Sequence, residues 1–168
     1  GKNWEREMLA LNEQAPTVLR TNSLKTTPRE LIADLNDENV EAFTIKNYPD
    51  AVQLAEKKNV FLTSAFKDGL FEVQDASSQK IGELLDVREG MRVVDACAGA
   101  GGKTLHLAAL MKNKGQIIAL DIYEWKLAEL KRRAKRAGAH NIETRLISDN
   151  KVIKRLHEKA DRLLIDAP

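Results

Sequence analysis

The fold is decided by residues 92–104, which read RVVDACAGAGGKT. The apolar run 91–94 is typical of a buried strand, and the pattern of 104–111 is typical of a helix. Between them lies a glycine-rich loop, and glycines allow positive φ angles and a close approach of the backbone to a ligand. The following helix offers free backbone N–H groups at its start. The stretch therefore predicts a ligand-binding loop at the carboxyl end of a parallel strand, where α/β folds bind their ligands.

Two common nucleotide motifs do not match this loop. A P-loop requires Gly-x-x-x-x-Gly-Lys-Ser/Thr, and Cys97 stands where its first glycine belongs, although Gly102-Lys103-Thr104 matches its end. The dinucleotide fingerprint Gly-x-Gly-x-x-Gly is met at Gly99 and Gly101, but its third glycine falls on a threonine. The alternative of a plain tight turn needs fewer glycines than this loop contains. We therefore expect a ligand site that is neither a P-loop nor a dinucleotide fingerprint.

Downstream of Gln74 the pattern alternates between helices and strands. Helices are expected at 77–85, 104–111, 124–137 and 152–158, and strands at 91–94, 116–120, 142–146 and 162–165. This alternation predicts a doubly wound parallel sheet with right-handed crossovers, which is a Rossmann-like α/β fold. Because four strands are few for this architecture, we expect the sheet to be incomplete at the C-terminus.

Residues 1–72 are predicted to form a small α+β unit ahead of the domain formed by residues 73–168. Within the small unit, a helix is expected at 4–11 and strands at 17–20, 40–45, 51–54 and 71–73. The clearest local signal is a second helix from Pro28 to about residue 35. Thr27 is its expected N-cap, and Glu30 completes a capping box.

Two aspartates follow strands of the predicted sheet. Asp121 stands 22 residues after Gly99, and an acidic residue about 20 residues beyond a glycine loop can accept hydrogen bonds from ribose hydroxyls. Asp149 follows the third strand, where its carboxylate or its backbone can face an adenine edge. Capping of the next helix is the alternative role for each residue. The glycine loop favours the ligand role for Asp121, whereas both roles stay open for Asp149.

The composition bounds the class of protein. The chain has 168 residues, of which 43% are apolar, and this is sufficient for a packed core. Its net charge is +2, so any nucleic-acid footprint must be local. Cys97 is the single cysteine, which excludes an intrachain disulfide and fits a reducing compartment. No apolar run approaches the roughly 20 residues needed to span a membrane, and no signal peptide is recognised, so we expect a cytoplasmic protein.

The loop and its partners resemble a known family. Residues 95–104 (DACAGAGGKT), Asp121, Asp149 and Asp166-Ala167-Pro168 resemble the bacterial rRNA cytosine-5 methyltransferases of the Fmu/Sun (RsmB) type and their NOL1/NOP2/Sun relatives. The usual family loop reads D-x-C-A-A-P-G-G-K-T, whereas this sequence has Gly-Ala in place of Ala-Pro. Upstream, residues 15–22 look like the start of the family's small RNA-binding domain, and residues 73–79 look like its junction with the catalytic domain.

The resemblance implies a class I methyltransferase sheet behind a small α+β RNA-binding domain. It implies transfer of a methyl group from S-adenosyl-L-methionine to C5 of cytosine in RNA, with small-subunit (16S) ribosomal RNA as the favoured substrate and transfer RNA as a second candidate. Asp166 is expected to orient the base, with Lys103 near the same junction. The cofactor contacts that the resemblance implies are Cys97, Ala98, Gly99, Ala100, Gly101, Gly102, Lys103, Asp121, Asp149 and Asp166.

The family's chemistry requires a cysteine thiolate that attacks C6 of cytosine, because C5 is otherwise a poor nucleophile. In the family, one cysteine directly follows the Asp-Ala-Pro motif and helps to release the product, and the attacking cysteine lies further on. Both would fall after Pro168. We therefore expect this chain to be a fragment without the catalytic cysteines, unable by itself to methylate RNA. Cys97 is the alternative nucleophile, but it matches the family's cofactor-loop cysteine.

Basic residues offer two candidate RNA contacts. By family position, the better candidates are Arg20, Lys25 and Arg29 of the first unit. A second cluster near the end of the helix expected at 124–137 is predicted to be a solvated face, and consists of Lys131, Arg132, Arg133, Lys135 and Arg136. No metal site is predicted, because His106, His140 and His157 share no ligand spacing.

Two other functions stay open. The first is another S-adenosylmethionine enzyme, such as an amino-group methyltransferase, whose fourth-strand motif also begins with Asp or Asn followed by Pro. The second is a non-catalytic RNA-binding module. The residue after Pro168 would separate the two enzymes, because a cysteine supports cytosine-5 transfer and an aromatic pattern supports amino-group transfer.

Overall fold

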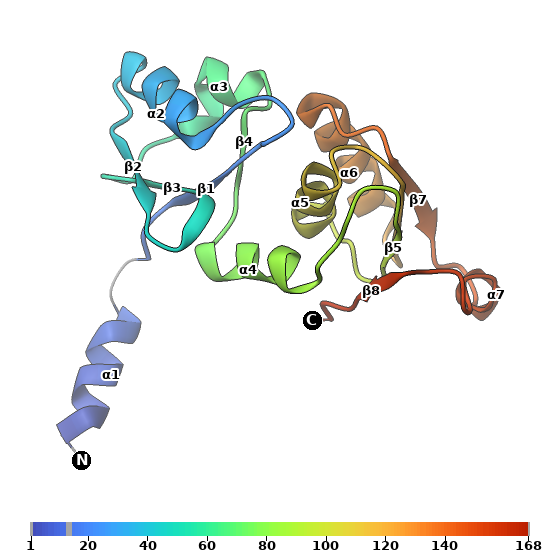
Figure 1. Cartoon of the computed structure of the whole chain (residues 1–168). Coiled ribbons are helices and arrows are strands. Elements are labelled where there is room, and N and C mark those ends of the chain that lie inside the picture. Colours follow the sequence, from blue (N-terminus) through green and yellow to red (C-terminus); the bar gives the residue numbers. More distant parts are fainter. Residues whose placement is uncertain (1, 13–14, 168) are drawn as a thin grey trace.

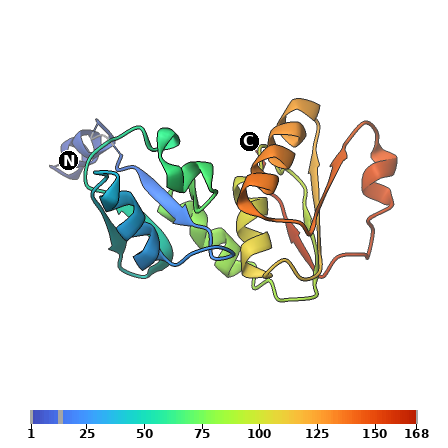
Figure 2. The same ribbon diagram turned by 90° about the horizontal axis from the view of Figure 1, so that it is seen from above.

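The computed structural model describes residues 2–12 and 15–167, and it contains two β-sheets from different parts of the chain. Figures 1 and 2 show the two units side by side, with the first sheet in blue to green and the second in yellow-green to red. An N-terminal helix, α1 (Lys2–Asn12), precedes both sheets. Among the described residues, no helix combines the length and the apolar character needed to cross a membrane.

The first unit is an antiparallel sheet covered by helices. Its elements are β1 (Val18–Thr21), α2 (Pro28–Asp37), β2 (Ala42–Ile45), β3 (Tyr48–Leu54), a 3-10 turn η1 (Val60–Leu62), α3 (Ser64–Lys67) and β4 (Phe71–Val73). The strand order is β2-β3-β1-β4, and every pair is antiparallel. This order and the succession of strands and helices are those of the ferredoxin-like split βαβ arrangement.

Local sequence signals explain how the first unit forms. The Thr27 hydroxyl accepts from the Glu30 amide at 3.3 Å, and the Glu30 carboxylate accepts from the Thr27 amide at 2.9 Å. The predicted capping box is therefore confirmed, with Pro28 in the first turn of α2. Leu31 and Leu35 of α2 are fully buried against the sheet, where they join a core that includes Phe71.

The second unit is a parallel sheet with helices on both faces. Its elements are α4 (Ala76–Leu84), β5 (Arg92–Asp95), α5 (Gly102–Leu110), β6 (Gln116–Asp121), α6 (Glu124–Ala137), β7 (Ile142–Leu146), α7 (Asn150–Lys154) and β8 (Arg162–Leu164). The strand order is β7-β6-β5-β8, and all pairs are parallel. The expected doubly wound fold is confirmed. The order reverses between β5 and β8, and this switch point is where such sheets bind ligands.

Alternate residues of the central strands enter two different cores. Val93 and Ile117 pack with residues of α5 and α6 on one face of the sheet. Val94 and Ile118 face the other side, where Val152 of α7 packs. Burial on both faces explains why these strands are continuously apolar rather than alternating.

Several element boundaries differ from the sequence-based expectations. The helix expected at 152–158 is α7 (Asn150–Lys154), which begins earlier because Asp149 caps it and which ends before Glu158 with its positive φ of 55°. The turn η1 and helix α3 were not predicted at all. They are too short for hydrophobic periodicity to reveal, although Asn59 and Thr63 cap them in the ordinary way.

A buried glutamate joins the two units. The Glu72 side chain on β4 is 6% exposed, and it pairs with Arg133 at 2.8 Å and with Arg136 at 2.5 Å, both on α6. The prediction of a solvated face for the basic cluster is therefore wrong for these two arginines. Arg132 of the same cluster does fit that prediction, because its side chain is 80% exposed. Helix periodicity places the cluster on α6, but it cannot reveal Glu72 as a partner, because Glu72 lies 61 residues from Arg133 in the sequence.

Two of the three basic residues expected to contact RNA instead take part in packing between the units. Arg20 is buried, and its guanidinium donates to the Gln74 side chain and to the Gly102 carbonyl. Burial lowers the pKa of Arg20 to about 10, so the group stays charged near neutral pH. The Lys25 ammonium donates to the Asp68 and Arg136 carbonyls at 2.7 and 2.8 Å. Only Arg29 of the three is exposed without a hydrogen bond to the second unit among the described residues.

The Glu72 pairing predicts a stability effect that can be measured. Replacing Glu72 with Gln should lower the free energy of unfolding by roughly 1–3 kcal/mol, because Gln removes the charge and one of the two acceptor oxygens that Arg133 and Arg136 use. Glu89→Gln is the matched control, since Glu89 also bridges two cations, Lys112 and Lys114, but on the exposed surface. That control should change stability by less than about 0.5 kcal/mol. Urea denaturation of both variants at neutral pH tests this, and equal losses would contradict the interface assignment.

Candidate functional site

A cavity of about 400 Å³ opens at the switch point of the parallel sheet. Its walls come from the carboxyl ends of four strands: the loop after β5 and the segments after β6, β7 and β8. The lining residues are Ala96, Cys97, Gly99, Asp121, Ile122, Tyr123, Lys126, Ile147, Asp166 and Ala167. A cavity of this size at this position fits a small-molecule ligand or cofactor.

The glycine loop leaves room for a ligand on one side and packs tightly on the other. Gly99 has a φ of 56°, and a side chain built there would meet nothing within 4 Å, so its Cβ side is open space. Gly101 has a φ of 89°, and a Cβ there would lie 2.6 Å from the Leu130 side chain. Gly101 is also the N-cap of α5, and it supplies no side-chain cap. The first turn of α5 therefore keeps N–H groups that a polar ligand can use.

Asp121 ties the glycine loop to the end of β6. One carboxylate oxygen accepts from the Gly99 amide at 2.8 Å, and the other accepts from the Tyr123 amide at 2.9 Å. The side chain is nearly buried at the edge of the cavity. Because a carboxylate has about four lone-pair sites, two remain for a pair of hydroxyl groups. The structure thus shows a positioning role for Asp121 beside the predicted ribose contact, and the contact itself stays a prediction.

Asp95 and Thr104 hold the two ends of the loop together. The Thr104 hydroxyl donates to the Asp95 carboxylate at 2.7 Å, and both side chains are buried. Burial raises the pKa of the Asp95 carboxyl above its ordinary value, although the hydrogen bonds from Thr104 and from the Cys97 amide oppose this change. Sequence reasoning placed both residues in the motif without assigning them this role.

An ion pair stands at the mouth of the cavity. The Lys103 ammonium lies 2.6 Å from the Asp166 carboxylate, which follows β8. The Lys103 side chain is 20% exposed and that of Asp166 is 49% exposed, so the pair faces solvent while remaining close to the cavity. The predicted proximity of these two residues is therefore confirmed. Their pairing depends on the β5–β8 contact, which brings residues 63 positions apart to one edge of the sheet.

The other predicted cofactor residues differ in their placement. Cys97 is a free thiol that lines the cavity and is half-buried. Ala98 is buried, and its amide donates to the Leu120 carbonyl, so it contributes to the loop's shape. The Ala100 carbonyl accepts from Arg133 at 2.9 Å. Asp149 does not line the cavity, and its carboxylate accepts from the Lys151 amide at 2.7 Å.

Asp149 therefore acts as a helix cap in this structure, which is the alternative role that the sequence left open. Sequence reasoning also missed six residues of the cavity wall: Ala96 and Ala167, which lie inside the two recognised motifs, and Ile122, Tyr123, Lys126 and Ile147, which lie outside them. The sequence marks the four residues outside the motifs only by their position, because Ile122, Tyr123 and Lys126 follow β6 and Ile147 follows β7. Tyr123 is half exposed, and the Lys126 ammonium lies 4.7 Å from the centre of its ring.

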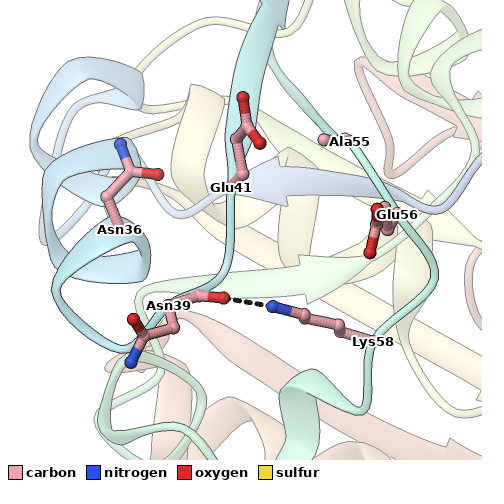
Figure 3. Close-up of a pocket in the computed structure, with 6 residues that line it drawn as sticks. All are labelled: Asn36, Asn39, Glu41, Ala55, Glu56 and Lys58. Carbon is pink, nitrogen blue, oxygen red and sulfur yellow. Dashed lines mark hydrogen bonds between the residues drawn. The ribbon is translucent and has the colours of Figure 1, made fainter.

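Two other cavities lack the combination of a glycine loop and a strand-end carboxylate that lines the cavity at the switch point. Figure 3 shows a polar pocket of about 250 Å³ in the first unit, where Lys58 donates to the Asn39 carbonyl and Glu41 and Glu56 stand apart. Its side chains do not converge on one point, so it offers no built site. A larger cavity beneath α7 is almost wholly apolar, with Leu120, Ile153 and Leu163 in its walls. No metal-binding group of three or more ligands occurs among the described residues.

The fold and the site define a class of protein: a doubly wound α/β domain with a glycine loop and a strand-end carboxylate at its switch point, preceded by a ferredoxin-like unit. Comparison with known families makes this specific. Residues 82–168 match the model of the 16S rRNA methyltransferase RsmB/F, and residues 1–61 match the ferredoxin-like domain of RsmF/B-like methyltransferases. The chain belongs to the RsmB/F methyltransferase family, as the sequence resemblance indicated.

Individual relatives agree with this assignment. The chain is 35% identical over 99% of its length to ribosomal RNA small subunit methyltransferase B of Klebsiella pneumoniae, and it spans 38% of that protein. It is 36% identical over 89% of its length to a probable methyltransferase B of Bacillus subtilis, and it spans 34% of that one. A solved methyltransferase homologue from Pyrococcus horikoshii is 32% identical, with a TM-score of 0.84 over 95% of this chain and 52% of that one. The chain thus spans well under half of the length of these curated relatives.

The geometry at Asp121 predicts a measurable loss of cofactor affinity. In the full-length protein, Asp121→Ala should weaken binding of S-adenosylhomocysteine by about 1.5–3 kcal/mol, because hydrogen bonds to a charged carboxylate are lost. Isothermal titration calorimetry measures this. Asp34→Ala is the control, since Asp34 is an exposed carboxylate on α2 of the other unit. Equal affinity in the two variants would remove Asp121 from the cofactor site.

Proposed function

We propose that the protein to which this chain belongs transfers a methyl group from S-adenosyl-L-methionine to C5 of cytosine in RNA, with small-subunit ribosomal RNA as the favoured substrate. One observation carries the proposal: the Lys103–Asp166 pair stands at the mouth of the cavity formed by the glycine loop and Asp121. A cofactor site and a polar base-binding group therefore meet at one edge of the sheet. Family membership supports the same reaction.

The cavity residues fit the cofactor. The open side of Gly99 and the uncapped start of α5 suit the amino-acid part of the molecule, and the remaining lone pairs of Asp121 suit the ribose hydroxyls. Ile122 and Ile147 provide apolar walls against which an adenine ring can pack. When bound, the cofactor supplies an electrophilic methyl group. The role proposed for the protein is to hold that group in line with the target carbon.

Asp166 and Lys103 are proposed to orient the cytosine. A carboxylate can accept from the exocyclic amino group of cytosine, and this hydrogen bond fixes the ring's rotation. The Lys103 ammonium holds the Asp166 carboxylate in place through the 2.6 Å contact. Orientation alone does not activate C5, so the reaction also requires a thiolate that adds to C6. The family resemblance assigns that thiolate to a cysteine after the Asp166-Ala167-Pro168 motif, and we propose none of the described residues for it.

The ferredoxin-like unit is proposed to contact the RNA. Because Arg20 and Lys25 bond to carbonyl groups within the protein, they are not offered as RNA contacts. Arg29 at the start of α2 is exposed and remains a candidate. Transfer RNA is a second substrate candidate, since nothing in the described cavity distinguishes the parent RNA molecule.

The proposed reaction predicts methyl incorporation at one atom. Full-length protein, tritiated S-adenosylmethionine and unmodified small-subunit RNA should yield 5-methylcytosine, which nucleoside digestion and chromatography identify. Asp166→Asn should lower the rate by about 10²–10⁴-fold, because the group that orients the base loses its charge while the cofactor site stays intact. Methylation of an exocyclic amine would contradict the proposal and favour an amino-group methyltransferase. Binding of RNA without any transfer would favour a non-catalytic module.

A substitution at Cys97 tests separately whether this thiol belongs to the cofactor loop or is the nucleophile that attacks C6. In the full-length protein, Cys97→Ser should keep kcat within about tenfold of the wild type, because a cofactor-loop residue acts on binding and does not form the covalent bond to C6. Any larger change should fall on the KM for S-adenosylmethionine. Steady-state rates at saturating cofactor and RNA measure kcat. Loss of transfer with intact cofactor binding would make Cys97 the nucleophile and overturn the assignment.

A further inference from the structure

A second large cavity lies between the two units, on the other side of the glycine loop from the cofactor cavity. It has a volume of about 620 Å³ and draws its walls from η1, α3, β4, the loop residue Ala100 and α6. Figure 2 shows α3 facing α6 across the junction. The residues that line it are Phe61, Phe66, Glu72, Val73, Ala100, Glu129, Arg132, Arg133 and Arg136. We call it the interdomain cleft.

The aromatic side of the interdomain cleft presents a ring to solvent. Phe66 is half-buried, and Phe61 meets it edge-to-face with ring centres 5.0 Å apart. Phe61 itself is 54% exposed. The Arg136 guanidinium lies 3.8 Å from the centre of the Phe66 ring, so that ring already has a cationic partner. Phe61 is therefore the ring that remains available for stacking by a flat ligand.

The opposite side of the interdomain cleft is cationic. The lining contains three arginines of α6 and two glutamates, Glu72 and Glu129, so it has a net positive charge. Arg133 and Arg136 are committed to the buried Glu72. Arg132 is different, because within the described part of the chain it pairs only with Glu129, one helical turn away, and its side chain is 80% exposed. Exposed pairs of this kind contribute little free energy, so an incoming phosphate can replace Glu129 at small cost.

We propose that the interdomain cleft binds a nucleotide of single-stranded RNA, with its base stacked on Phe61 and its phosphate paired with Arg132. An exposed aromatic ring and an exposed guanidinium in one cleft are a combination suited to single-stranded nucleic acids, because every base has a stacking face and every linkage has a charge. The proposal rests on the RNA substrate put forward under Proposed function. It adds a site outside the cofactor cavity, on the far side of a loop that both sites share.

The pairings around Glu72 make the interdomain cleft a preformed site. Arg133 donates to Glu72 and also to the Ala100 carbonyl in the glycine loop, so the wall of the cleft is fixed to the cofactor site. Binding in the cleft leaves the Arg133 and Arg136 pairings with Glu72 in place, and of the cleft's arginines only Arg132 exchanges its partner, which favours affinity. The carboxylates of an acidic protein segment could also pair with Arg132, but they have no aromatic face to stack on Phe61.

The test uses the full-length protein and filter binding to small-subunit RNA across a range of salt concentrations. Phe61→Ala should weaken binding by roughly 5- to 100-fold, the effect of losing one base stack. Phe61→Tyr should restore it, because the ring is kept. Arg132→Ala should lower the slope of log K against log salt by about 0.7, as expected for one phosphate contact to a single strand. The matched controls are Phe43→Ala, an exposed phenylalanine on β2, and Arg88→Ala, an exposed arginine paired with Asp86.

Each result decides between the proposals. RNA affinities of Phe61→Ala and Arg132→Ala within about twofold of the control variants would overturn the interdomain cleft as an RNA site. Unchanged S-adenosylhomocysteine affinity in both variants is expected, since neither residue lines the cofactor cavity. If the wild type binds RNA through Phe61 and Arg132 but forms no 5-methylcytosine, the cleft proposal stands and the proposed reaction fails. If the wild type forms 5-methylcytosine and both variants bind normally, only the cleft proposal fails.

Discussion

The junction between the two units and the shape of the glycine loop both depend on the hydrogen bonds of one guanidinium group, that of Arg133. It donates to the Glu72 carboxylate on β4 and to the Ala100 carbonyl in the glycine loop. A single side chain of α6 therefore connects the ferredoxin-like unit to the loop of the parallel sheet. Arg20 makes the complementary connection from β1, by donating to the carbonyl of Gly102 at the start of α5. Two guanidinium groups, one from each unit, therefore donate hydrogen bonds to carbonyls of the glycine loop.

These contacts explain why the glycine loop can be open on one side without losing its shape. Gly99 and Gly101 have positive φ angles, and because glycine has no Cβ its backbone has more accessible conformations than that of other residues. Asp121 fixes the amide of Gly99, and Leu130 packs against Gly101. The carbonyls of Ala100 and Gly102 are fixed by arginines. The loop is thus fixed by side chains of α6, β6 and β1, together with the Thr104–Asp95 hydrogen bond that joins its own ends.

Local and periodic features of this protein could be predicted from sequence, whereas the long-range pairings could not. The capping box at Thr27 and Glu30, the buried strands around Val93 and Ile117, and the glycine loop follow from patterns within a few residues. The Lys103–Asp166 proximity followed from the family motif and is confirmed. Arg20 and Arg133 were assigned to solvent or RNA, because nothing near them in the sequence reveals Glu72 or the loop carbonyls as partners.

The polar character of this junction has a physical reason beyond holding the two units together. Buried ion pairs are weak contributors to stability, and well-packed apolar residues of similar volume can replace them without loss. An apolar junction could therefore join the units equally well. It could not donate hydrogen bonds to the carbonyls of Ala100 and Gly102, because only an N–H or O–H group satisfies a buried carbonyl. Arginine also reaches Glu72 and Ala100 at the same time, since its planar group carries five donors. Arginine is thus suited to residues 20 and 133 because both side chains must donate hydrogen bonds to carbonyls of the glycine loop. Glu72 can be buried because Arg133 and Arg136 neutralise its charge.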